Sequence, residues 1–243
     1  VTIIHQAARE PEISQLCRFL NNMGAVICGM GTDHLMVQGV SGLHDSSFRV
    51  EGDRIVAGTY GAAAVAAGGE VLLRGIRPSE LKVPLEEFEK TGAAVDADEE
   101  NCQIRIGMWS RPLPLLIKTE PYPGFPTDLQ SPFLAFLATA RGTSYIEEQV
   151  FEGRFATAKI LEQMGAVIRT EDRRAVIEGH YPLKGAAVNA CDLRGGAALM
   201  VAALAAEGDT FIGECHHIER GYEDICRDMA ALGANIRWVG KDS

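Results

Sequence analysis

The chain repeats one sequence pattern at an interval close to 70 residues. In this pattern a helix with one apolar and one charged face ends in a Gly-Ala pair. The pair begins at Gly24, Gly92, Gly165 and Gly233, which are 68, 73 and 68 residues apart. A regular interval of this length indicates repeated supersecondary units. The fold is therefore expected to be a set of similar units packed together.

A second helix pattern, rich in alanine, lies within each unit and is followed by a glycine and a short apolar strand. These helices are expected from Gly61 to Gly69, Pro132 to Gly142 and Leu193 to Gly208. Each complete unit reads strand, helix, strand, helix, strand, strand (βαβαββ). Because the alanine-rich helices have almost no polar face, they are expected inside, with the sheets outside and three units around one axis. The predicted fold class is α/β.

The first part of the chain contains only the second half of such a unit. Residues 10 to 23 predict an amphipathic helix, and the residues after it predict a pair of strands. A polar stretch at 46 to 53 then precedes the next helix pattern. We expect residues 1–51 to be the last part of a first domain and residues 52–243 to be a second domain of three units.

Charge and hydropathy limit the class of protein. The net charge is −10 and the pI is near 5.1, which argues against a general nucleic-acid or anionic-membrane surface. No window reaches the ~18 consecutive apolar residues of a membrane span. The first residues, Val1 to His5, lack the order of a signal peptide. A cytoplasmic protein without nucleic-acid or membrane partners is predicted.

The six cysteines form no C-x-x-C pair, so we expect free thiols rather than disulfides or zinc. They are Cys17, Cys28, Cys102, Cys191, Cys215 and Cys226. His216 and His217 follow Cys215, but no second ligand cluster of suitable spacing exists. No metal site is predicted.

A proline-rich segment from Pro121 to Gln130 precedes the second alanine-rich helix. Three prolines fix φ and bias the residues before them toward extended geometry, so a stiff, non-helical arm is expected. This arm would place Asp128 at a helix N-terminus. From spacing alone, Asp128 is either a helix cap or a rigidly held carboxylate that serves as a base.

Four motifs in order carry a resemblance to a known family. They are Pro121 to Asp128, Phe151 to Phe155, Asp192 to Arg194 and His217 to Glu223. Together they resemble the UDP-N-acetylglucosamine 1-carboxyvinyltransferase (enolpyruvyltransferase) family, and the likeness runs over the whole length of the chain.

The resemblance implies the enolpyruvyl transferase fold, in which two inside-out α/β domains of three units each enclose the substrates in a cleft. This chain would then hold the C-terminal three and a half of six units. The family's N-terminal part carries a lysine–asparagine pair and a mobile loop with a cysteine proton donor. None of the six cysteines here lies in a matching loop, so the chain is expected to be inactive without that missing region.

The implied reaction moves the enolpyruvyl group of phosphoenolpyruvate to the 3′-hydroxyl of UDP-N-acetylglucosamine and releases phosphate. It is the first committed step of bacterial peptidoglycan precursor synthesis, and therefore belongs to cell-wall biogenesis, cell shape and division. It uses no cofactor. The chemistry needs a base, cations for a phosphate and a carboxylate, and an acid.

The resemblance assigns the base and the cations to this chain. Asp128 matches the residue that contacts the sugar hydroxyl and takes its proton. Arg194 and Arg220 match arginines that hold phosphoenolpyruvate, and both are expected to precede helical runs. Arg154 matches a further substrate-facing arginine, and the backbone of Val150 matches a contact to the nucleotide sugar.

Some of these residues have other interpretations. Without the resemblance, Arg220 reads as a solvated surface residue. Asp192 either orients Arg194 or caps its helix. Gly153 and Gly195-Gly196 depart from the family's pattern, and we expect them to loosen the backbone beside two arginines.

Two other functions remain open. The chain alone is either part of the enzyme or a non-catalytic domain that binds anions or pairs with a separate N-terminal chain. A related enzyme, 3-phosphoshikimate 1-carboxyvinyltransferase, shares the fold and the phosphoenolpyruvate chemistry. The motifs of this chain resemble those of that enzyme less than those of the nucleotide-sugar enzyme.

Overall fold

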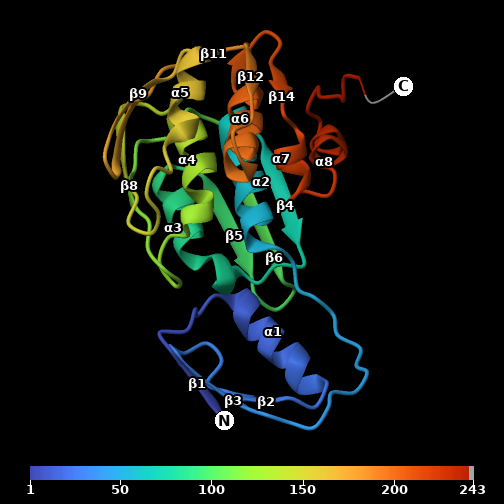
Figure 1. Ribbon diagram of the computed structural model, residues 1–243. Helices are drawn as coiled ribbons and strands as arrows, with labels where there is room; N and C mark the ends of the chain where they lie inside the picture. Colours follow the sequence, from blue (N-terminus) through green and yellow to red (C-terminus); the bar gives the residue numbers. More distant parts are fainter. Residues whose placement is uncertain (241–243) are drawn as a thin grey trace.

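The computed structural model describes residues 1–240, which form a small N-terminal lobe and a larger body (Figure 1). The lobe consists of β1 (Thr2–His5), α1 (Pro11–Asn22), β2 (Val26–Cys28) and β3 (His34–Gln38). Its three strands pair antiparallel in the order β1-β3-β2. The lobe therefore has the predicted helix and the predicted pair of strands, and in addition the strand β1, which was not predicted.

Three successive units make up the larger body. The first contains α2 (Arg54–Ala67), β4 (Glu70–Arg74), the 3₁₀ helix η1 (Pro78–Leu81), α3 (Lys82–Lys90), β5 (Ala94–Asp98) and β6 (Gln103–Gly107). The second contains β7 (Leu116–Lys118), the 3₁₀ helix η2 (Thr127–Leu129), α4 (Gln130–Leu137), β8 (Thr143–Glu147), α5 (Ala156–Gln163), β9 (Val167–Glu171) and β10 (Arg174–Glu178). The third contains β11 (Leu183–Lys184), β12 (Ala187–Asn189), α6 (Leu193–Leu204), β13 (Ala206–Glu207), β14 (Phe211–Gly213), α7 (His216–Glu219) and α8 (Ile225–Ala231).

Only the second unit has the full predicted order within residues 1–240. Its sheet runs β7-β8-β10-β9, with β7 parallel to β8 and the other pairs antiparallel. The first unit lacks the leading strand and has the sheet β4-β6-β5. The third has the parallel pair β12 and β14, but no strand pair follows α8 in the described part of the chain.

The repeated Gly-Ala pairs end helices α1, α3, α5 and α8 in the same way. Each glycine has a positive φ, between 86° and 100°, and each following alanine N–H donates to a carbonyl five residues earlier. This pattern is the Schellman motif, which needs a residue in the left-handed region. The sequence repeat thus reflects the recurrence of one helix-ending turn, which glycine adopts without strain.

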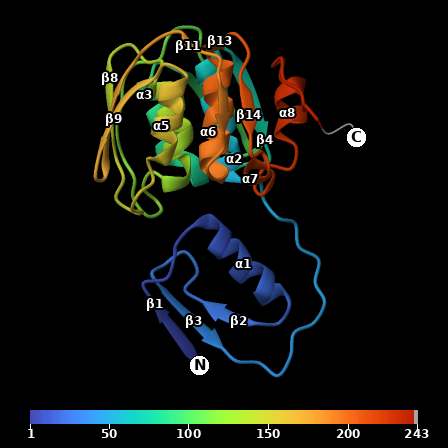
Figure 2. The same ribbon diagram turned by 45° about the horizontal axis from the view of Figure 1, so that its top comes forward.

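The three alanine-rich helices, α2, α4 and α6, pack against one another at the centre of the body, and the sheets lie outside them (Figure 2). Every residue of α4 is buried. Small residues permit the close approach: a Cβ added to Gly58 of α2 would meet the Leu129 side chain at 2.5 Å. The predicted inside-out arrangement is confirmed.

The bounds of these helices differ from the prediction. Helix α2 begins at Arg54 instead of Gly61, because the Asp53 carboxylate caps it and accepts from the N–H groups of Ile55 and Val56 at 2.7 and 3.0 Å. Helices α4 and α6 end five and four residues before the predicted glycines. None of the helices in the described residues has both the length and the apolar character needed to cross a membrane.

The lobe and the body have separate hydrophobic clusters and meet through polar contacts. Glu12 of α1 accepts two hydrogen bonds from the buried Arg54, at 2.9 and 3.2 Å. Glu51, just before α2, forms ion pairs with Arg18 of α1 at 3.6 Å and with Arg77 of the body at 3.4 Å. The segment between β3 and α2 carries the chain from one to the other (Figure 1).

Candidate active site at the ends of the central helices

The proline-rich segment folds back on itself before it reaches Asp128. The N–H of Glu120 donates to the carbonyl of Phe125, and the N–H of Gly124 donates to the carbonyl of Pro121, both at 2.9 Å. The segment is non-helical, as predicted, only up to Pro126, where it is a hydrogen-bonded loop instead of an extended arm; Thr127–Leu129 form a 3₁₀ helix and Gln130 begins α4, which the prediction missed. The loop leads into η2, which contains Asp128.

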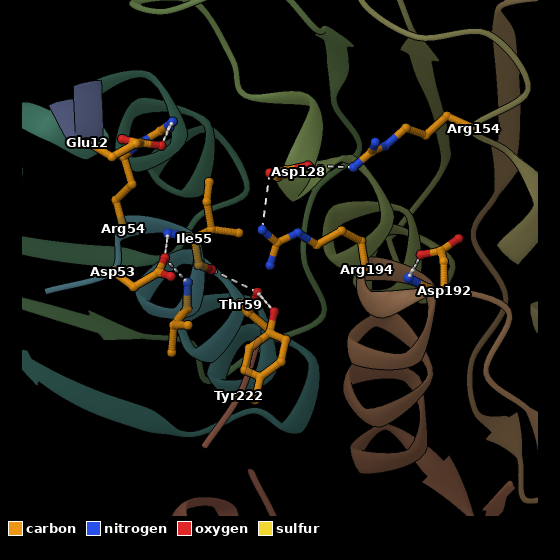
Figure 3. Close-up of polar contacts among 12 residues, drawn as sticks. Glu12, Asp53, Arg54, Ile55, Thr59, Asp128, Arg154, Asp192, Arg194 and Tyr222 are labelled. Carbon is orange, nitrogen blue, oxygen red and sulfur yellow. Dashed lines mark hydrogen bonds and ion pairs between the residues drawn. The ribbon is translucent and has the colours of Figure 1, made fainter. Parts of the chain in front are cut away.

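Asp128 does not cap a helix. Neither η2 nor α4 has a side-chain cap hydrogen bond. Its Oδ1 accepts from Arg154 Nη2 at 2.6 Å and its Oδ2 accepts from Arg194 Nη2 at 3.1 Å (Figure 3). The capping interpretation was therefore wrong, and the structure brings three of the predicted site residues together.

Arg194 is the second residue of α6, so its guanidinium lies near the positive end of that helix. Burial alone would lower the pKa of Arg194, but the Asp128 carboxylate and the Tyr222 phenol outweigh it, and the pKa is raised. Asp192 accepts from Gly195 N at 2.7 Å, so it caps the helix, as one of its two interpretations predicted.

The glycines after Arg194 are set in tight packing. A Cβ on Gly195 would meet Thr157 Oγ1 at 2.7 Å, and one on Gly196 would meet the Ile218 side chain at 2.5 Å. The expectation that they loosen the backbone was wrong. They are glycine because neighbouring side chains fill the space that a Cβ would need.

Arg154 and Val150 lie in the loop between β8 and α5. The Arg154 guanidinium lies 5.1 Å from the centre of the Phe151 ring, a cation–π contact that supports its position. The N–H of Val150 donates to Glu148 Oε1 at 2.9 Å, so this amide is already satisfied within the protein. Gly153 has φ +67°, which suits the turn of the loop.

Glu148 is a buried carboxylate that joins the two loops of the site. It also accepts from the N–H of Phe151 at 3.0 Å and from the Thr127 hydroxyl at 3.0 Å. Thr127 precedes Asp128, and Phe151 contacts Arg154. Glu148 was not predicted as a site residue, because nothing in the local sequence distinguishes it from an exposed glutamate at the end of a strand.

Arg220 does not join the cluster in this conformation. It is exposed and is the C-cap residue of α7; helix α8 begins five residues later, so Arg220 precedes a helical run, as predicted, but does not stand at its N-terminus. No hydrogen bond or ion pair joins its side chain to another of the residues 1–240. The neighbouring Gly221 packs against Leu193, so Arg220 is held at the same end of α6 as Arg194.

The site faces the N-terminal lobe. Arg54, Asp128 and Arg194 all lie at the N-terminal ends of central helices; in Figure 3 Asp128 and Arg194 point toward one another, whereas the Arg54 side chain points toward Glu12. Burial would raise the pKa of Glu12, but the hydrogen bond from Arg54 outweighs it and the pKa is lowered; the Asp128 charge opposes this change. The Asp128 charge therefore acts on Glu12, at the contact between lobe and body.

The cluster can do acid–base and anion-binding chemistry. A carboxylate and arginines at the ends of helices provide a base and cationic donors for phosphate or carboxylate groups. None of the six cysteines, all of which lie within residues 1–240, is in a disulfide. No group of three His, Cys, Asp or Glu side chains in residues 1–240 has the spacing of a metal site.

The family model described as EPSP synthase (3-phosphoshikimate 1-carboxyvinyltransferase) matches residues 1–229, so the chain belongs to this family of enolpyruvyl transferases. Among curated proteins, it is 46% identical over 239 residues to UDP-N-acetylglucosamine 1-carboxyvinyltransferase 1 of Legionella pneumophila (strain Lens). It is 47% identical over 238 residues to UDP-N-acetylglucosamine 1-carboxyvinyltransferase 2 of Carboxydothermus hydrogenoformans.

Each of these alignments covers 98% of this chain but 47% and 57% of the relatives. The chain thus spans about half the length of the curated relatives it matches. Among solved structures, the enolpyruvyl transferase NikO from Streptomyces tendae has a TM-score of 0.85 and 27% identity over 97% of this chain and 56% of its own. EPSP synthase from Acinetobacter baumannii, at 18% identity, has a TM-score of 0.68 over 91% of this chain and 54% of its own, and it shares the fold.

Proposed function

We propose that this chain is part of an enzyme that transfers the enolpyruvyl group of phosphoenolpyruvate to the 3′-hydroxyl of UDP-N-acetylglucosamine. The activity named for its curated relatives supports this assignment. The single structural observation that carries it is the contact of both Asp128 oxygens with arginines, Arg154 at 2.6 Å and Arg194 at 3.1 Å. Peptidoglycan precursor synthesis in a bacterial cytoplasm is the corresponding role.

The proposed reaction has an addition and an elimination step. The sugar hydroxyl oxygen forms a bond to C2 of phosphoenolpyruvate while Asp128 takes the hydroxyl proton and an acid protonates the C3 methylene. Loss of a C3 proton then forms the new double bond and expels phosphate. Arg194, Arg154 and Arg220 supply the positive charge that the phosphate and the carboxylate require.

The site needs further groups beyond those on this chain. We propose that residues 1–51 complete a first domain and residues 52–243 form a second, with the cleft between them. Glu12 and Arg54 join the two parts beside Asp128 and support this division. The acid for C3 and most of the nucleotide-sugar contacts would then come from the rest of a polypeptide of the relatives' length.

Substitution of Asp128 tests the assignment in a polypeptide of that length. Asp128→Asn keeps the shape but cannot accept the proton, so kcat should fall by about 10²- to 10⁴-fold. The matched control is Asp96→Asn, at an exposed carboxylate on strand β5. Near-normal kcat for Asp128→Asn would remove Asp128 from the chemistry.

The family model carries the name of the 3-phosphoshikimate enzyme, so that acceptor is a second candidate. A competition assay with both acceptors and limiting phosphoenolpyruvate distinguishes the two. We expect product from UDP-N-acetylglucosamine only. For the chain alone, calorimetry should show no tight binding of UDP-N-acetylglucosamine, and tight binding would contradict the division of the site described above.

A further inference from the structure

Tyr222 is buried behind Arg194 and belongs to none of the predicted site residues. It is 2% exposed and lies between α7 and α8. Its phenol oxygen lies 2.9 Å from Thr59 Oγ1 of α2, and Figure 3 shows the phenol and the Arg194 guanidinium facing one another. One phenol thus connects two central helices next to the proposed site.

The direction of these hydrogen bonds follows from the number of hydrogens. Thr59 has one hydroxyl hydrogen, and it donates this hydrogen to the carbonyl of Ile55 at 2.9 Å. In the contact between Thr59 and Tyr222, the phenol must therefore be the donor. The lone pairs of the phenol oxygen then remain for an N–H of Arg194, because arginine has donors only.

We infer that Tyr222 is a positioning residue that holds Arg194 in its anion-binding orientation through a directed chain from guanidinium to phenol to Thr59 to the Ile55 carbonyl. The inference rests on the proposed function, in which Arg194 binds phosphoenolpyruvate. Tyr222 itself does not touch the substrate in this account. Tyr222 orients the Arg194 guanidinium.

A neutral acceptor suits this role better than a second carboxylate. The charge of Arg194 is already shared with Asp128, at 3.1 Å. A phenol fixes another edge of the guanidinium without neutralising the charge that an anionic substrate must meet. When Asp128 engages the sugar hydroxyl, the phenol continues to hold the arginine.

Burial keeps the phenol in the protonated form that the chain requires. Burial raises the pKa of Tyr222, while the Thr59 hydroxyl and the Arg194 charge oppose it, and the net change is upward. The Tyr222 hydrogen is therefore present at neutral pH. The Tyr222 hydroxyl therefore donates to Thr59 Oγ1 throughout the pH range in which the enzyme would work.

The test is Tyr222→Phe in a polypeptide of the relatives' length, with Tyr60→Phe as the matched control. Tyr60 is the residue after Thr59, and its hydroxyl donates to Asp228 of α8 at 2.9 Å. Both variants remove one hydroxyl that forms a hydrogen bond. We expect the KM for phosphoenolpyruvate to rise about 10-fold in Tyr222→Phe with kcat within about 3-fold, and neither to change in Tyr60→Phe.

Two variants of Thr59 test the direction of the chain. Thr59→Ser keeps the hydroxyl and should keep the KM of the unchanged protein. Thr59→Val keeps the shape, removes the acceptor for the phenol hydrogen and should raise the KM in the same direction as Tyr222→Phe. Equal effects of serine and valine would overturn the directed chain.

A readout without turnover separates this inference from the proposed function. The Nε–Hε signal of Arg194 in the NMR spectrum, assigned with Arg194→Lys, should exchange faster with water in Tyr222→Phe and remain unchanged in Tyr60→Phe. Absence of enolpyruvyl transfer by the unchanged protein would reject the proposed function alone. An unchanged Arg194 signal in Tyr222→Phe would overturn the role of Tyr222 whatever the activity.

Discussion

Asp128 and Arg194 form an ion pair at 3.1 Å although they are 66 residues apart in the sequence. The separation is close to one repeat, because each residue stands at the start of the central helix of its unit. Arg54 has the same place at the start of α2. Repetition of the unit around an axis therefore brings equivalent positions of successive units into one site.

A change of Arg194 to lysine should weaken the site more than loss of charge would suggest. Lysine keeps the positive charge but has one donor centre, and it cannot donate to Asp128 and to Tyr222 in the fixed directions of a guanidinium. We expect kcat/KM for phosphoenolpyruvate to fall by about 10- to 100-fold in steady-state kinetics. The exposed Arg174 provides a control: Arg174→Lys should leave kcat/KM unchanged. Equal values for the two variants would contradict the prediction.

Glu148→Gln should destabilise the protein and loosen both loops of the site. The amide group of glutamine has only one acceptor oxygen, so it cannot serve the Thr127 hydroxyl together with the N–H groups of Val150 and Phe151. The expected loss in the free energy of unfolding is about 2 kcal/mol, measured by urea denaturation. The adjacent Glu147→Gln, at a partly exposed ion pair, should change it by less than about 1 kcal/mol.

Gly58→Ala should disturb the packing directly beneath Asp128. The added Cβ would lie 2.5 Å from a methyl carbon of Leu129, which follows Asp128 in the chain and has no exposed surface. Overpacking of this kind costs about 1–3 kcal/mol, and a shift of Leu129 should also reduce kcat. Gly69→Ala is the control, because nothing lies within 4 Å of its added Cβ. Calorimetric melting of the two variants checks the difference.

The pH dependence of stability should reveal Glu80, at the contact between body and lobe. Burial, together with a hydrogen bond and the charge of Glu51, raises the pKa of Glu80 to about 7, while Arg77 and Arg18 act in the opposite direction. A carboxyl whose pKa is higher in the folded than in the unfolded state binds more protons when folded. Its contribution to stability is present below the unfolded pKa and is lost as the pH rises through about 7.

Glu80→Gln removes this loss because glutamine stays neutral. Relative to the unchanged protein, the variant should gain about 1 kcal/mol at pH 8 and nothing at pH 4.5, a small figure because water screens the partly exposed pair. Urea denaturation at several pH values measures the difference. A gain of the same size at both pH values would show that ionisation of Glu80 is not the cause.

The repeat and its inward helices could be predicted because each depends on local sequence. A glycine in the left-handed region ends each amphipathic helix, and an alanine-rich helix is buried because it has almost no polar face. The start of α2 was misplaced because the Asp53 cap was not recognised. Within residues 1–240 no strand pair follows α8, and nothing in the sequence pattern indicated this, since the Gly-Ala pair at Gly233 resembles the others.

The site was predictable only in its separate parts. Motif likeness selected Asp128, Arg154 and Arg194, but spacing alone favoured a helix cap for Asp128. Tyr222 meets Thr59 across 163 residues, and such a contact leaves no periodic pattern in the sequence. The side chains that orient the charged groups therefore appear only after the chain has folded.

The separation of the two hydrophobic clusters governs how the lobes can move. A hinge at the segment between β3 and α2 would break the contacts of Arg54 with Glu12 and of Arg77 with Glu51, while each apolar core stays closed. Water and dissolved ions replace such contacts at little cost. Rotation of one lobe relative to the other should therefore become easier as ionic strength increases, without a matching decrease in the melting temperature of the larger body.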